Sequence, residues 1–136
     1  MRRNKMNARK VEALGCTFDS VAEYKYALWL EHLVQSKRIL CWSHHTAAIH
    51  LTVKGHLIAT MHPDFTITPI RNGMAVEFHE VKGMATAKWR MERKLLAAQY
   101  SRIKYIVIDA GQPGGPNTGT EPRLFDDRPR RKRRKK

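Results

Sequence analysis

The sequence has few cysteines and no long apolar run. Its two cysteines, Cys16 and Cys41, form no CxxC pair, which argues against a disulfide framework and a cysteine-rich zinc site. No stretch approaches the roughly 20 apolar residues of a membrane span. The basic N-terminus lacks the apolar centre of a secretory signal. We therefore expect a soluble, cytoplasmic protein that does not contact membranes.

Acidic residues are missing from both ends of the chain. The 136 residues, enough for one domain, include 26 basic and 12 acidic side chains, for a net charge of +14. Half of the basic residues lie in two segments, 2–10 and 128–136, and every acidic residue lies between them. The middle of the chain is therefore nearly neutral. Terminal charge runs of this kind are typical of disordered arms that bind polyanions by releasing counterions.

These observations divide the chain into four parts. We expect a basic arm over residues 1–16, a folded core over 17–110, a linker rich in glycine and proline over 111–127, and a basic tail over 128–136. The arm residues predicted to contact nucleic acid are Arg2, Arg3, Lys5, Arg9, Lys10, Arg130, Arg131, Lys132, Arg133 and Arg134.

The central stretch, residues 62–83, predicts a β-hairpin. Residues 64–67 and 74–82 are strand-like, and Arg71-Asn72-Gly73 supplies a turn between them. Side chains alternate along a strand, so Glu80 and Lys82 share a face. Pairing across the turn places Asp64 opposite the Glu80 end. Two carboxylates and an ammonium then meet at one sheet edge, a pattern that suits metal-assisted phosphodiester hydrolysis with Mg2+. The alternative is an ordinary cross-strand ion pair.

A helix is predicted before the hairpin, over residues 20–37. Ser20 is its expected N-cap, with Asp19 as a competitor. Glu23 has two interpretations. Ser20-x-x-Glu23 is a capping box, yet Glu23 also shares a helical face with apolar residues and needs a partner if buried. With the hairpin in view, we favour a place in the active site.

The other predicted elements frame the hairpin. Strands are expected over residues 39–43, 48–53 and 56–60, with Lys54-Gly55 as a turn. A helix capped by Thr86 follows over 86–100, and a central strand, reached by a crossover, over 104–109. The apolar residues expected on that helix are Ala87, Met91, Leu95 and Ala98. Its cations, which either are simply solvated or face a DNA backbone, are Lys88, Arg90, Arg93 and Lys94.

The order of these elements and residues resembles the PD-(D/E)XK nuclease superfamily. The motifs are Phe18-x-Ser20-x-x-Glu23, Pro63-Asp64-Phe65 and Glu80-x-Lys82-Gly83. They are similar to those of phage endonuclease I-type Holliday junction resolvases and of related small phage nuclease-like proteins. The resemblance covers residues 17–109. It implies an α/β restriction-endonuclease-like core of αβββαβ order, in which helices flank a mixed sheet.

The same resemblance implies an activity and the roles of single residues. The chain would be a Mg2+- or Mn2+-dependent endodeoxyribonuclease, a homodimer acting on four-way or otherwise branched DNA in phage recombination or processing, in the host cytoplasm. Asp64 and Glu80 would be metal ligands, with the Val81 backbone carbonyl as a third. Lys82 would position the attacking water, and Glu23 would be an accessory acid. Glu77 and His79 depart from the pattern, because they put polar groups where apolar packing is expected.

Two other interpretations stay open. The seven histidines raise the possibility of a histidine-based nuclease, but His44-His45 is not followed by the spacing of a ββα-metal site. A non-catalytic nucleic-acid-binding protein on a degenerate nuclease fold is the second. It does not account for carboxylates clustered where phosphates must dock, and a cleavage assay separates it from the enzyme.

Overall fold

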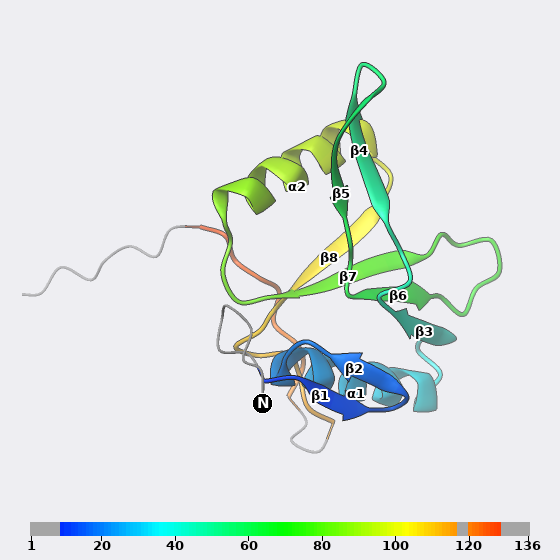
Figure 1. Ribbon diagram of the computed structural model, residues 1–136. Coiled ribbons are helices and arrows are strands. Elements are labelled where there is room, and N and C mark those ends of the chain that lie inside the picture. The colour runs from blue at the N-terminus through cyan, green and yellow to red at the C-terminus, as the bar shows by residue number, and fades with distance from the viewer. Residues whose placement is uncertain (1–8, 117–119, 129–136) are drawn as a thin grey trace, which may run out of the picture.

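The protein is a mixed α/β structure in which a four-stranded sheet separates two helices (Figure 1). The computed structural model describes residues 9–116 and 120–128. Within them lie two helices and three small sheets. The elements in chain order are β1 (Val11–Ala13), β2 (Cys16–Phe18), α1 (Val21–Gln35), β3 (Cys41–His44), β4 (Ile49–Val53), β5 (His56–Met61), β6 (Phe65–Thr68), β7 (Glu77–Lys82), α2 (Ala87–Gln99) and β8 (Lys104–Asp109).

The main sheet has the strand order β3-β6-β7-β8. β6 pairs antiparallel with both β3 and β7, and α2 connects β7 to the parallel strand β8. The predicted hairpin is thus present, although its second strand begins at Glu77 rather than at residue 74. The turn lies where it was predicted, with Gly73 at a φ of 86° and the Met74 amide donating to the Arg71 carbonyl.

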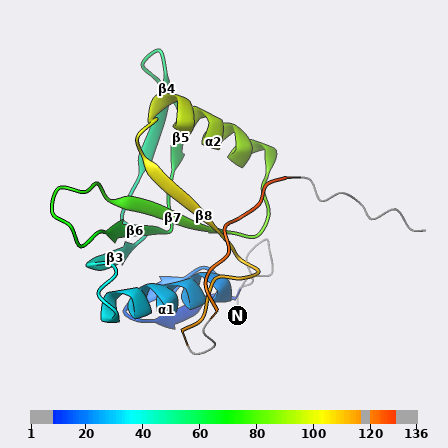
Figure 2. The same ribbon diagram turned by 180° about the vertical axis from the view of Figure 1, so that it is seen from behind.

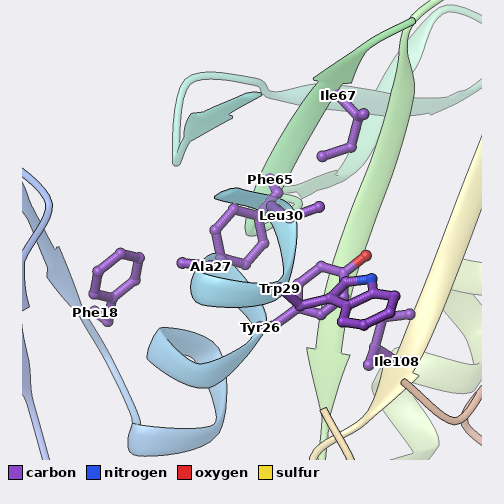
Figure 3. Close-up of a cluster of buried hydrophobic side chains, with 8 residues drawn as sticks. All are labelled: Phe18, Tyr26, Ala27, Trp29, Leu30, Phe65, Ile67 and Ile108. Atoms are coloured by element: carbon purple, nitrogen blue, oxygen red, sulfur yellow. The ribbon is translucent and has the colours of Figure 1, made fainter. Parts of the chain in front are cut away.

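The first apolar core lies between α1 and the sheet. Phe65 and Ile67 of β6 and Ile108 of β8 pack against Tyr26 and Leu30 of α1 (Figure 3).

The N-cap prediction for α1 is confirmed, because the Ser20 hydroxyl accepts a hydrogen bond from the Glu23 amide at 3.1 Å.

A second apolar cluster lies on the other side of the sheet, under α2. It joins Ile49, Leu51 and Met61 of the β4–β5 hairpin to Leu96 of α2. Both views of the ribbon show this hairpin and α2 on the side of the sheet opposite α1 (Figures 1 and 2). The β4–β5 hairpin is therefore an insertion between the first two strands of the main sheet.

The predicted N-terminal arm is shorter than expected. Residues 11–18 form the β1–β2 hairpin, which packs on α1 through Val11, Ala13 and Cys16. Its two-residue turn, Leu14-Gly15, has φ angles of 54° and 73°, the conformation that favours tight hairpins. The basic composition of the segment concealed this alternation of apolar and polar residues.

The predicted linker is also wrong as far as the structure describes it. The Phe125 amide donates to the Val107 carbonyl at 2.9 Å, and the Asp109 amide donates to the Arg123 carbonyl at 2.8 Å. We call residues 120–128 the C-terminal strap. It pairs along β8, which is an edge strand of its sheet and not the central strand that was predicted.

The apolar residues expected on α2 differ in their burial. Leu95 packs against the second cluster, whereas Met91 is 59% exposed and Ala87 and Ala98 are exposed. The buried side chains of α2 are Trp89 and Leu96. The Trp89 ring packs edge-on against Phe125 of the strap. Neither described helix is both long and apolar enough to cross a membrane.

Candidate functional site

Asp64 lies immediately before β6 and is held by β7. Its Oδ2 accepts a hydrogen bond from the Val81 amide at 2.8 Å. The register places Phe65, the next residue, opposite His79, so Asp64 lies near the Glu80 end of β7, as the sequence predicts. The Val81 backbone therefore orients the Asp64 carboxylate. Whether its carbonyl is also a ligand stays a prediction.

Glu80 and Lys82 share the α2 side of β7. Glu80 Oε2 accepts hydrogen bonds from the Trp89 indole at 3.1 Å and from the Tyr105 hydroxyl at 2.8 Å. The Lys82 ammonium lies 3.8 Å from Glu80 Oε1 and 5.3 Å from the centre of the Trp89 ring. Burial, followed by the charges of Glu80 and Asp64, raises the pKa of Tyr105. Asp64 is thus close enough to act electrostatically on this group.

Glu23, in the first turn of α1, is only 4% exposed. Its backbone amide takes part in the helix cap, but its carboxylate contacts His44 and lies 3.1 Å from His45 Nε2. Burial, followed by the negative charge of Asp64, raises the pKa of Glu23 to about 8. The Glu23 amide therefore takes part in the N-cap, and the Glu23 carboxylate contacts the histidines. Its role as an active-site acid stays a prediction.

His44 and His45 belong to the site, although the sequence pattern assigned them no role. His44 ends β3, and its ring stacks on that of His45 with centroids 3.8 Å apart. Neighbouring residues of a strand face opposite sides, but His45 has a φ of 53°. This left-handed conformation costs a non-glycine residue about 1–2 kcal/mol and turns its ring toward that of His44.

Asp64 connects the histidines to the hairpin. The His45 amide donates to the Asp64 carbonyl at 2.9 Å, and His45 Nε2 lies 3.3 Å from Asp64 Oδ1. The hydrogen bond to Asp64 raises the pKa of His45, whereas burial and then the charge of His45 lower the pKa of His44. Within this pair of histidines, protonation is therefore favoured at His45 over His44.

The arrangement offers ligand atoms to a cation. Within the described residues, one group of three such side chains meets: Glu23, His44 and His45, whose ligand atoms all lie within 4.8 Å of one another. Asp64 lies beside them. The sequence signal for this group was the pair of consecutive histidines at the end of a short strand. It was not decisive, because neighbouring side chains of a strand are expected on opposite faces of the sheet.

The departures at Glu77 and His79 have a structural explanation. His79 faces α1 on the side of the sheet away from Glu80, and its Nδ1 pairs with the Tyr26 hydroxyl. Its Nε2 lies 3.4 Å from Glu77, which pairs with Lys104 at 3.0 Å. Burial lowers the pKa of His79. The polar side chains of β7 on this face are therefore paired with one another and with Tyr26 and Lys104, which allows the strand to be buried here.

The predicted DNA-contacting cations of α2 have protein partners in part. Lys88 pairs with Glu92 and Arg90 with Asp127, while the Arg93 guanidinium lies 4.8 Å from the centre of the Tyr105 ring. A cavity of about 700 Å³ beside Trp89 and Tyr105 is lined by Arg90, Arg93 and Lys94. Basic groups therefore lie beside Trp89 and Tyr105, the two side chains that donate hydrogen bonds to Glu80.

The arms are only partly within the described residues. Arg9 and Lys10 are exposed. The other predicted arm contacts, Arg2, Arg3, Lys5, Arg130, Arg131, Lys132, Arg133 and Arg134, lie outside the described residues.

Comparison with known proteins identifies one family. No curated protein and no solved structure matches the chain. A family model described as "Protein of unknown function (DUF1064)" matches residues 3–111, which include both helices and every strand of the described part of the chain, together with Glu23, His44, His45, Asp64, Glu80 and Lys82. The chain therefore belongs to the DUF1064 family.

Proposed function

We propose that this protein is a metal-dependent DNA endonuclease with a core of the PD-(D/E)XK type. One observation carries the proposal: the β6–β7 pairing and the Val81–Asp64 hydrogen bond join Asp64 to the Glu80-Val81-Lys82 segment. Glu23 from α1 is close enough to Asp64 for the charge of Asp64 to raise its pKa. Asp64, Glu80 and Lys82 thus lie at the same end of the sheet, and Glu23 would be the accessory acid.

The order of the elements supports the same type of core. A helix, α1, precedes β3, β6 and β7, which pair antiparallel, and α2 then leads to the parallel strand β8. This is an αβββαβ order once the β4–β5 hairpin is taken as an insertion. It agrees with the order expected from the sequence, on which the resemblance rests together with the residue types at the motif positions.

The two carboxylates suit a divalent cation. Asp64 is anchored by Oδ2, and Glu80 by Oε2. Each of them directs its other oxygen elsewhere, Oδ1 toward His45 and Oε1 toward Lys82. Outer hydrogen bonds of this kind orient ligating carboxylates. Asp64 and Glu80 would hold the cation, which would supply an activated water and polarise the phosphate.

Lys82 has a separate part in the proposed reaction. Its ammonium is held near Glu80 and against the face of Trp89, so its position does not depend on substrate. A fixed cation beside the carboxylates can orient the attacking water and offset negative charge that develops on the phosphate. The cations of α2, beside the neighbouring cavity, would contact the DNA backbone.

The substrate class extends the proposal. The resemblance to endonuclease I-type resolvases favours a homodimer that cuts branched DNA, above all four-way junctions, during phage recombination or processing. A panel of linear, nicked, flap and four-way substrates tests this part, together with the mass of the protein in solution. If a monomer cleaves all these forms equally, the preference for branched DNA is wrong and the protein is a general nuclease.

The central test compares two isosteric variants with the wild type. Asp64→Asn and Glu80→Gln keep side-chain size but remove a charge needed at the cation. We expect each to lower cleavage of DNA in Mg2+ or Mn2+ by about 100-fold or more, the range seen when a group at the reacting centre is removed, with DNA binding largely retained.

The matched control is Glu12→Gln, the same change at an exposed residue of β1, and it should cleave like the wild type. Full activity in excess EDTA, or in both site variants, would contradict the proposal. A wild type that binds DNA and never cleaves it would favour the non-catalytic nucleic-acid-binding alternative.

A further inference from the structure

Two histidines stand beside the carboxylates of the proposed nuclease site. The ligand atoms of Glu23, His44 and His45 lie within 4.8 Å of one another. The Asp64 and Glu80 pair used in the proposed function includes no imidazole. The histidines therefore add a different type of ligand to this end of the sheet.

Two distances in the cluster match those between ligands of one ion, whereas His44 Nε2 and Glu23 Oε1 are in closer, hydrogen-bonded contact and would have to separate. His45 Nε2 lies 3.1 Å from Glu23 Oε1 and 3.3 Å from Asp64 Oδ1. Nitrogen and oxygen ligands about 2.0–2.2 Å from a metal are roughly 3 Å apart from each other in tetrahedral or octahedral sites. The three atoms could thus surround an ion after small side-chain rotations.

The cluster is built into the protein and is not a surface coincidence. The side chains of Glu23 and His44 are 5% and 6% exposed, and His45 is 37% exposed. A buried carboxylate is costly without a partner, and a bound cation would be one. The partly open side, at His45 and Asp64, leaves a path for the ion.

The backbone supports the same interpretation. His45 adopts a left-handed φ of 53° and is fixed there by its amide bond to the Asp64 carbonyl. Strained residues of this kind cluster at functional sites. Here the left-handed backbone at His45 brings the rings of two consecutive histidines to the same carboxylate, that of Glu23.

We propose that Glu23, His44 and His45, with Asp64 at the edge, bind a divalent transition-metal ion such as Mn2+. Imidazole nitrogens favour such ions, whereas Mg2+ prefers oxygen ligands and water. The inference rests on the proposed function only in that Glu23 and Asp64 belong to both sets. It assigns the site a metal preference that carboxylates alone would not have.

The test measures metal binding without DNA. Titration calorimetry with Mn2+ and Mg2+, on metal-free full-length protein, should give a Kd for Mn2+ at least about 10-fold below that for Mg2+. Glu23→Gln and His45→Asn should each weaken Mn2+ binding by about 10-fold or more. Asparagine tolerates the left-handed conformation, so it isolates the ligand from the backbone. The control is His56→Asn, at an exposed position in β5.

A second measurement needs no variant. Pulsed electron paramagnetic resonance of Mn2+ bound to the wild-type protein should show couplings to imidazole nitrogen. Absence of those couplings, or equal affinities for Mn2+ and Mg2+, would overturn the inference even if His45→Asn failed to fold.

The two proposals fail in different ways. Cleavage in Mg2+ that is unchanged in His45→Asn, with no nitrogen coupling to Mn2+, would refute the histidine site and leave the nuclease. Tight Mn2+ binding through nitrogen, with no cleavage of any DNA, would refute the nuclease and leave the metal site.

Discussion

His79 shows how a polar residue is accommodated in the buried strand β7. It is 7% exposed, its Nδ1 pairs with the Tyr26 hydroxyl, and its Nε2 faces Glu77. Burial is the main reason that its pKa is lowered, and the nearby Glu77 charge opposes the shift only in part. The neutral imidazole is therefore the form that the folded protein favours.

The lowered pKa of His79 makes the free energy of unfolding depend on pH. The unfolded chain binds a proton at His79 with the ordinary pKa of about 6.5, and the folded protein binds it less tightly. Unfolding therefore takes up a proton below pH 6.5, and the free energy of unfolding falls as the pH drops toward the folded-state pKa. One proton corresponds to a slope of about 1.4 kcal/mol per pH unit.

We expect His79→Gln to reduce this slope between about pH 6.5 and the folded-state pKa. Urea denaturation in EDTA at several pH values measures it, and His62→Gln, at an exposed position, is the control. Glu23 affects the pH dependence in the opposite direction. Because its pKa is raised in the folded protein, its contribution to the free energy of unfolding is lost as the pH rises from about 4.5 to about 8. Only the difference between variant and wild type therefore isolates His79. Equal slopes in both would contradict the assignment.

Single residues of the site were predictable when periodicity applied to them. Asp64, Glu80 and Lys82 were assigned to one end of the hairpin because strand alternation and a turn at Gly73 fix their places. His44 and His45 were missed because the left-handed backbone at His45 breaks that alternation. Such a conformation at a histidine depends on a tertiary hydrogen bond to Asp64, which no local pattern contains.

Among the elements, those with local start and stop signals were predictable. Ser20 and Thr86 cap α1 and α2 as expected, and Lys54-Gly55 forms the turn of the β4–β5 hairpin. The burial of Trp89 in α2 was not predictable, because it depends on tertiary contacts and not on a local signal. Trp89 is buried because its indole reaches Glu80 and its ring meets Phe125, a residue far away in the sequence.

The C-terminal strap leads to a prediction about stability. It contributes backbone hydrogen bonds to Val107 and Asp109, an ion pair from Arg123 to Asp109 at 2.6 Å, and the Phe125 interaction with Trp89. A chain that ends at Pro116 has none of these. With about 1 kcal/mol for each hydrogen bond and a similar amount for the partly buried ring, its free energy of unfolding should fall by about 2–4 kcal/mol in urea denaturation.

A chain that ends at Arg128 is the matched control for the strap, because it keeps every interaction named above. Its free energy of unfolding should stay within about 0.5 kcal/mol of the wild type. Equal stability of the two truncated chains and the wild type would show that the strap contributes nothing to the fold, as a linker would.

At the scale of the whole molecule, positive charge is concentrated near the two ends of the sequence. The stretch between the two terminal basic segments is nearly neutral, whereas residues 130–136 alone carry seven basic side chains and no acidic one. In the proposed nuclease, affinity for DNA would then come largely from the ends, and the chemistry from the folded part. Neither contribution depends on base sequence.

This distribution of charge predicts that binding and cleavage can be separated by truncation. The chain ending at Arg128 should bind every form of DNA more weakly, since it lacks seven basic side chains that could contact phosphates. Its plot of log Kobs against log salt should be flatter, by about 0.9 for each phosphate that the shortened chain no longer neutralises. Cleavage at saturating DNA should be nearly unchanged, because Asp64, Glu80 and Lys82 are untouched. A full-length chain with those seven residues replaced by serine controls for length. Fluorescence anisotropy over a salt series measures the slope, and an unchanged slope in both chains would place the DNA-binding charge elsewhere, on α2 or the N-terminal arm.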